Sequence, residues 1–215
     1  GYSTGYQTPI SLKGSANTTV FEDMNDVVLE NFNSMSSRAD YLDALLKLHS
    51  AGKTNWQQTA VNSIAASERI REIQGSIPAT YPNSPNGRRF STLAAMMKNG
   101  VNIKTANIEF AANFDVHSDA GILDGQTAGD LKDLSACIQA FKDDLGSLWG
   151  HVTIVTITEF GRRLEENASR GFDHGWGSAM FVMGGGVKGG RVITQWPGLN
   201  DLRDGDLKVT LDYRH

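Results

Sequence analysis

Apolar residues recur every three or four positions through the first half of the chain, which is the spacing of one face of an α-helix. A stretch with three prolines, residues 76–87, interrupts this pattern and predicts a loop. Gly75 stands just before the loop and predicts a C-terminal cap for the preceding helix. The helices that the spacing predicts cover residues 21–32, 39–49, 55–73 and 90–99.

The pattern changes in the second half of the chain. Residues 108–114 alternate between apolar and polar side chains, which predicts a strand, and residues 131–145 carry their apolar positions on one helical face. Residues 152–157 are almost wholly apolar and β-branched, as in a strand buried on both faces, and 179–183 is a further short strand candidate. A strand, a helix and a second strand of these lengths predict two parallel strands joined by a right-handed crossover.

These elements predict an α/β fold with a parallel-sheet core and a helical N-terminal portion. We expect a mainly helical portion with a leading loop over residues 1–100 and an α/β portion over residues 101–215. At 215 residues and 40% hydrophobic content, the two portions suit one compact domain. Residues 1–19 contain no predicted helix or strand that could begin a domain, so we expect the domain to be part of a longer protein.

The composition of the chain argues against nucleic acid, an intrachain disulfide and a membrane span. A net charge of −4 with interspersed signs argues against nucleic acid as a partner. The single cysteine, Cys137, cannot form a disulfide within the chain. No apolar run approaches the roughly 20 residues that span a bilayer, so no membrane span is predicted.

Side chains with metal-binding and anion-binding chemistry follow the predicted strands. The carboxyl ends of parallel strands meet at one edge of a sheet, where open α/β folds bind their ligands. Carboxylate oxygens and imidazole nitrogens there suit zinc, manganese or a similar divalent ion. Arg162 is the candidate catalytic residue because a guanidinium beside such an edge suits an oxyanion. The candidate metal ligands are Asp115, His117, Glu159, Asp173 and His174.

Each of these residues also has a structural interpretation. Asp115 and Asp173 could cap a loop or a helix, and His117 could be a loop histidine. Glu159 and Arg162 are three positions apart and could form a structural ion pair. Three other histidines lie at a helix end, at the opposite edge of the sheet or at the terminus and are not candidates: His49, His151 and His215.

Five short segments carry a resemblance to a known family. They read FDVH, TEFGR, GFDHG, GGGVKGG and LDYR, at residues 114–117, 158–162, 171–175, 184–190 and 211–214. In this order they resemble the bacterial domain of unknown function 1501 family, from about residue 107 to 214. The chain departs from the usual residues of that family at Val116 and Phe172, where threonine is common, and at Thr158, where serine is common.

The resemblance implies an alkaline-phosphatase and sulfatase-like fold in a longer protein exported with a twin-arginine signal. The chain would then be the C-terminal half, in the periplasm or outside the cell. The missing N-terminal half of the same protein would supply the nucleophile and further metal ligands.

The resemblance allows two assignments of the ligands. In that superfamily an adjacent Asp-His pair binds two different metals, and Asp173-His174 matches this pair in residue type. Thr158-Glu159 matches it in position instead, because it follows directly on a predicted buried strand. We prefer the assignment by strand position. Asp115 and His174 are ligands in both assignments, and His117 follows Asp115 by two positions where the superfamily usually has four.

Three functions are consistent with these residues. The first is a metal-dependent hydrolase of phosphate or sulfate esters in the full-length protein, acting on a small anionic ester or a surface glycan. The second is an exported binding or assembly module whose metal site is degenerate. The third is a purely structural network of carboxylates and arginines.

Overall fold

The computed structural model describes residues 2–3, 12–14, 19–20, 38–52, 54–74, 80–121 and 123–212. It divides into two compact units, Gly1–Phe110 and Ala111–His215. The division falls ten residues after the boundary expected from the sequence. That the two portions form one compact domain stays a prediction.

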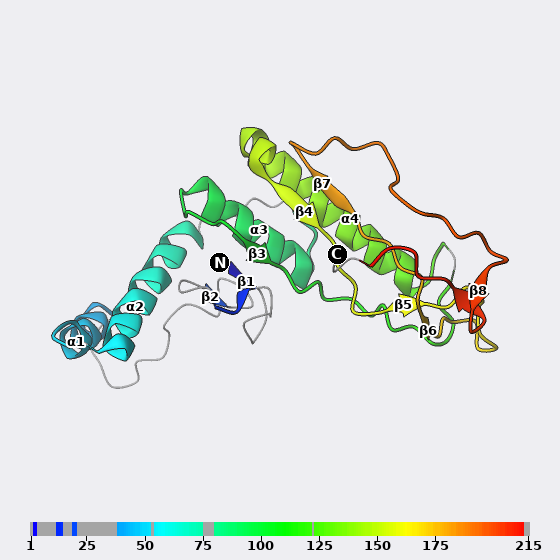
Figure 1. The fold of residues 1–215 in the computed structure, drawn as a ribbon. Coiled ribbons are helices and arrows are strands. Elements are labelled where there is room, and N and C mark those ends of the chain that lie inside the picture. Colours follow the sequence, from blue (N-terminus) through cyan, green and yellow to red (C-terminus); the bar gives the residue numbers. More distant parts are fainter. Residues whose placement is uncertain are drawn as a thin grey trace. The chain divides into compact units, whose positions relative to one another are not determined.

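Helices dominate the first unit (Figure 1). Helices α1 (Arg38–Ser50) and α2 (Asn55–Gln74) pack against each other and confirm the predictions for 39–49 and 55–73. The predicted helix over 21–32 and the cap at Gly75 lie outside the described residues. A small parallel sheet has the strand order β2 (Thr19–Val20), β1 (Tyr2–Ser3), β3 (Ala106–Asn107).

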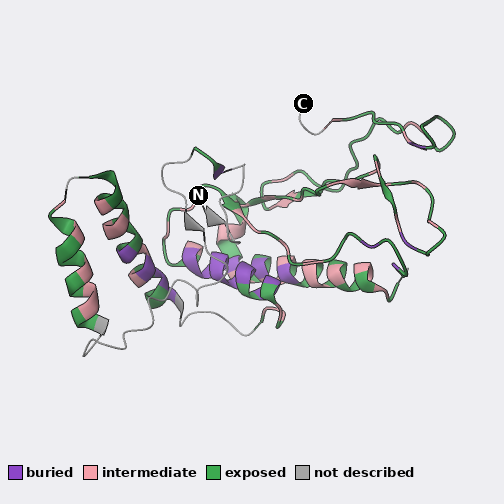
Figure 2. Ribbon diagram, turned by 90° about the horizontal axis from the view of Figure 1, so that it is seen from below, coloured by how far each residue is buried: buried purple, intermediate pink, exposed green. Residues whose placement is uncertain are grey.

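Helix α3 (Pro85–Lys98) packs against α2 and begins five residues before its predicted start. Ser84 caps the N-terminus of α3, and Pro85 follows it as a residue that favours the first helical turn. The Ser84 hydroxyl accepts a hydrogen bond from the Gly87 amide at 3.0 Å, and Pro85 occupies the first helical turn. The predicted loop over residues 76–87 therefore ends before Ser84, which caps α3. Residues 89–96 of α3 are all buried, as Figure 2 shows.

The second unit contains helix α4 (Gln126–Leu145), the 3-10 helix η3 (Gly146–His151) and two strands that pair antiparallel, β4 (Thr153–Val155) and β7 (Val182–Gly184). The predicted helix over 131–145 is confirmed, and both strands fall within or beside their predicted segments. Among the described residues, none of the helices combines the length and the apolar character needed to cross a membrane.

The predicted strand over residues 108–114 is wrong, because these residues form no strand in the structure. At the end of this stretch, backbone amides donate hydrogen bonds to side chains instead of to a neighbouring strand. The Asn113 amide donates to Asp130 and the Asp115 amide donates to the Asn113 side chain, each at 3.2 Å. The described residues therefore do not pair this stretch with β4, and β4 has an antiparallel partner instead. The α/β fold with a parallel-sheet core stays a prediction.

Two short ladders shape the rest of the second unit. Strand β5 (Gly161–Arg162) pairs antiparallel with β6 (His174–Gly175), and β8 (Leu202–Arg203) pairs antiparallel with β9 (Asp206–Leu207). The buried Asp206 carboxylate joins the two ladders. It accepts hydrogen bonds from the backbone amides of Leu164 at 3.2 Å, Trp176 at 2.8 Å and Leu207 at 2.7 Å.

Candidate metal centre

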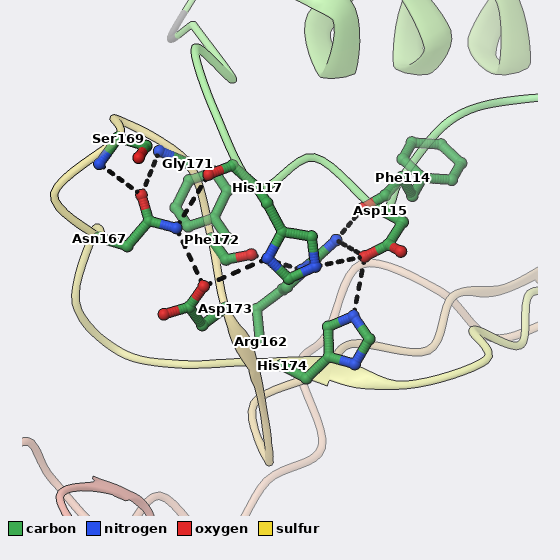
Figure 3. A network of polar contacts seen from close by, with 10 residues as sticks. All are labelled: Phe114, Asp115, His117, Arg162, Asn167, Ser169, Gly171, Phe172, Asp173 and His174. Carbon is green, nitrogen blue, oxygen red and sulfur yellow. Dashed lines mark hydrogen bonds and ion pairs between the residues drawn. The ribbon is translucent and has the colours of Figure 1, made fainter.

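One carboxylate oxygen is the centre of a polar cluster in the second unit (Figure 3). Asp115 Oδ1 lies 2.8 Å from His174 Nε2 and 2.9 Å from His117 Nε2. The same oxygen lies 3.3 Å from a guanidinium nitrogen of Arg162. Asp115 and both histidines are about half exposed, so the cluster faces solvent.

Strand pairing and an arginine clamp assemble this cluster. The β5–β6 ladder sets Arg162 directly opposite His174. Arg162 Nη1 donates to the Phe172 carbonyl at 2.6 Å, and Nη2 donates to the Phe114 carbonyl. Arg162 therefore fixes the residue before Asp115 and a residue near His174 to the same guanidinium. A catalytic role for Arg162 stays a prediction.

The two ring nitrogens of His117 face different carboxylates. Nε2 points to Asp115, whereas Nδ1 lies 3.2 Å from Asp173 Oδ1. Asn167 holds Asp173 in this place, because its Nδ2 donates to Asp173 Oδ1 at 3.0 Å and to the His117 carbonyl at 2.9 Å. Asp173 therefore lies behind His117 as seen from Asp115.

An aromatic ring supports the second histidine. Phe160 stacks on the imidazole of His174 with ring centroids 4.0 Å apart and an interplanar angle of 16°. The Arg162 guanidinium lies 4.9 Å from the centroid of the same phenyl ring. These contacts limit the orientations that His174 can take.

The hydrogen bonds favour the charged form of both carboxylates. The hydrogen bond with His174 is the main cause that lowers the pKa of Asp115 below its ordinary value of 3.8, and the charges of His117, His174 and Arg162 act in the same direction. The hydrogen bond from Asn167 is the main cause that lowers the pKa of Asp173, followed by the one from His117. Both side chains are thus anionic at neutral pH.

The cluster fits a divalent ion by its donor types and spacing. Ligand atoms of Asp115, His117 and His174 lie within 4.8 Å of one another. Two ligand atoms on a tetrahedral zinc ion are about 3.4 Å apart, given bonds of about 2.1 Å. The nitrogen–oxygen separations of 2.8 and 2.9 Å need to widen by some tenths of an ångström, which half-exposed side chains allow. One carboxylate with two imidazoles is also a usual donor set for zinc with an open position.

Three of the five candidate ligands come together in this cluster: Asp115, His117 and His174. Asp173 contacts the cluster through the far nitrogen of His117, and Glu159 is not one of its members. The sequence analysis missed Asn167 and Phe160. The side-chain oxygen of Asn167 accepts a hydrogen bond from the backbone amide of Ser169, two positions further along the chain, at 2.9 Å. Asn-initiated turns of this kind are common in loops and gave no specific signal.

The described residues form helices and short strands, with a solvent-facing Asp-His-His group whose atoms are close enough to hold an ion. A family model described as "Protein of unknown function (DUF1501)" matches residues 11–208. The chain therefore belongs to the DUF1501 family. No curated protein and no solved structure matches it significantly.

Proposed function

We propose that this chain is the metal-binding part of a divalent-metal-dependent hydrolase that acts on phosphate or sulfate esters. Asp115, His117 and His174 would hold the ion, with zinc or manganese as the candidates. The observation that carries the proposal is the convergence of two imidazole Nε2 atoms on Asp115 Oδ1, at 2.8 and 2.9 Å. When bound, the ion would polarise the ester and stabilise negative charge on its oxygens.

The residues of the chain have separate roles in this proposal. Asp115 provides negative charge at neutral pH, which favours a cation, and its hydrogen bond with His174 lowers its pKa further. Arg162 holds the segments that carry Asp115 and His174, and its positive charge would attract an anionic ester. Phe160 would keep the ring of His174 in place.

The nucleophile belongs to a different part of the full-length protein in this proposal. Aspartate and histidines make up the cluster, and none of its three members is a serine, threonine or cysteine. In this proposal the full-length protein is alkaline-phosphatase-like, this chain is its C-terminal half, and an N-terminal half would supply the nucleophile. Export to the periplasm or beyond, and a small anionic ester or a surface glycan as substrate, belong to the same proposal. We therefore expect the isolated chain to have little or no esterase activity.

Metal binding by the chain tests the proposal. We expect one equivalent of zinc or manganese, measured by elemental analysis after dialysis and by calorimetric titration. His174→Ala and Asp115→Asn remove a ligand and should weaken binding by at least 100-fold. His151→Ala is the matched control, because His151 is an exposed histidine of η3 outside the cluster.

Retention of metal by His174→Ala at the wild-type affinity would contradict the assignment of the cluster. A folded wild-type chain that takes up neither metal would contradict the hydrolase proposal itself. That second result would favour the alternative, a binding or assembly module with a degenerate site. The exposure of Asp115, His117 and His174 to solvent suits this alternative as well.

A further inference from the structure

The imidazole of His117 lies between two carboxylates, and only one of them faces the cluster. Asp115 is on Nε2 at 2.9 Å and Asp173 is on Nδ1 at 3.2 Å. The lone-pair directions of the two ring nitrogens diverge, so a single ion cannot bind Nε2 and also reach a carboxylate placed on Nδ1. The contact with Asp173 therefore excludes it from sharing an ion with His117 in this arrangement.

We infer that Asp173 and Asn167 are positioning residues that select the metal-binding nitrogen of His117. Asp173 accepts the Nδ1 proton, which leaves Nε2 as the ligand and turns it toward Asp115 and His174. A carboxylate on the second ring nitrogen is the usual means by which proteins orient a histidine ligand and raise its basicity. The inference rests on the proposed function, because it takes His117 as a ligand, and it changes the predicted role of Asp173.

Asn167 makes the orientation rigid. Its Nδ2 donates both to Asp173 and to the carbonyl of His117, so the amide ties the carboxylate to the residue that it orients. Its Oδ1 accepts the amides of Ser169 at 2.9 Å and Gly171 at 3.0 Å. All four contacts of the Asn167 side chain hold the loop between β5 and β6 in one conformation (Figure 3).

The backbone segments that carry Asp173 and His117 also pack against each other and are joined by hydrogen bonds. A β-carbon added to Gly171 would lie 2.1 Å from the carbonyl carbon of His117, so the loop packs directly on the backbone of that residue. Three amide-to-carbonyl hydrogen bonds of 2.9–3.0 Å join the loop to residues 116–120: Phe172 to Val116, Asp119 to Ser169 and Ala120 to Arg170. The orientation of His117 is therefore built into the chain before a metal binds.

A comparison of two substitutions at Asp173 tests the inference with zinc as the probe and the whole chain as the protein. Asp173→Asn keeps an oxygen that can accept the Nδ1 proton, whereas Asp173→Ala does not. We expect zinc affinity to fall in the order wild type, Asp173→Asn, Asp173→Ala, with a total loss of about 10- to 100-fold and unchanged stoichiometry. If Asp173 were itself a ligand, Asp173→Ala would remove one oxygen from the coordination shell seen by X-ray absorption, whereas a positioning role leaves that shell unchanged.

Asn167→Ala should weaken zinc binding in the same range. Ser169→Ala is its matched control, because Ser169 contacts Asn167 through its backbone amide, which the substitution keeps. Nuclear magnetic resonance of the zinc-loaded wild type should detect a slowly exchanging proton on Nδ1 of His117. This signal should persist in Asp173→Asn and disappear in Asp173→Ala. The wild-type signal requires no variant to fold.

The failures of the two proposals are distinguishable. Zinc binding that is absent from the wild type, or unaffected by His174→Ala, contradicts the proposed metal site and with it the inference. Zinc binding that depends on His174 but is as tight in Asp173→Ala and Asn167→Ala as in the wild type contradicts the positioning role alone. Absence of a protected Nδ1 proton in the zinc-loaded wild type contradicts it too.

Discussion

At the scale of single residues, Asp115 brings the most groups together. One of its oxygens interacts with the neighbouring His117, and with Arg162 and His174, which are 47 and 59 positions further along the chain. Asp173 repeats this on a smaller scale with Asn167 and His117. Such hydrogen bonds favour the ionised carboxylate and link local protonation to the stability of the fold.

We predict that part of the stability of the metal-free chain depends on these two carboxylates and is lost in acid. Their pKa values are lower in the folded state than the ordinary 3.8, so the unfolded chain binds more protons as the pH falls through this region. Their contribution is present above about pH 4 and disappears below it. Urea unfolding between pH 7 and pH 3, with a chelator present, measures this.

The double variant Asp115→Asn and Asp173→Asn should be less stable than the wild type at pH 7 and should approach it below pH 4. Asp124→Asn, at an exposed carboxylate outside the cluster, is the control and should run parallel to the wild type. A constant difference between the double variant and the wild type across the whole range would contradict the prediction.

At the scale of elements, local sequence signals predicted the helices well and the strand pairing poorly. Helices α1, α2 and α4 follow from apolar spacing, which reports a regular property of neighbouring residues. Residues 108–114 alternate as a strand would, but backbone amides at the end of this stretch bond to side chains such as Asp130. Pairing depends on distant partners, and a period of two does not specify them.

The candidate site was predicted in part for the same reason. The sequence predicts that Asp115, His117 and His174 meet at the carboxyl edge of parallel strands, and the three residues do lie together. The β5–β6 ladder and the hydrogen bonds of Arg162 bring them together, rather than such an edge. The relation of Asp173 to the far nitrogen of His117 depends on the course of the loop between β5 and β6. Asn167 fixes that course through two local contacts within its own turn and through contacts with Asp173 and the distant carbonyl of His117, which no local pattern predicts.

The buried Asp206 joins the β5–β6 and β8–β9 ladders, so we expect its removal to destabilise the second unit. Asp206→Ala leaves three backbone amides without their acceptor, and Gly175 packs against the same carboxylate. We expect the free energy of unfolding to fall by about 2–4 kcal/mol. Asp204→Asn is the control for urea unfolding, because Asp204 is an exposed aspartate of the same hairpin with φ of 55°, a conformation that asparagine also tolerates. We expect Asp204→Asn to change the free energy of unfolding little. Equal stability of both variants would contradict the joining role.

At the scale of the whole molecule, the two compact units differ in what the sequence predicted of them. In the first unit, α3 forms as a helix as its pattern predicts, but residues 89–96 are all buried, so its burial covers more than one helical face. In the second, residues 152–157 have the composition of a strand buried on both faces, yet Val155 is 48% and Ile157 is 68% exposed. The pattern therefore predicts further strands beside β4, where the described residues place only β7. The parallel-sheet core stays a prediction for this reason.

The position of a bound ion tests the central claim most directly. Crystals of the chain grown with zinc should give one strong peak in an anomalous difference map at the zinc edge. We expect this peak about 2.0–2.2 Å from Nε2 of His117, Nε2 of His174 and a carboxylate oxygen of Asp115, with Asp173 on Nδ1 of His117. A peak elsewhere on the chain, or no peak in crystals where the three side chains are ordered, would contradict it.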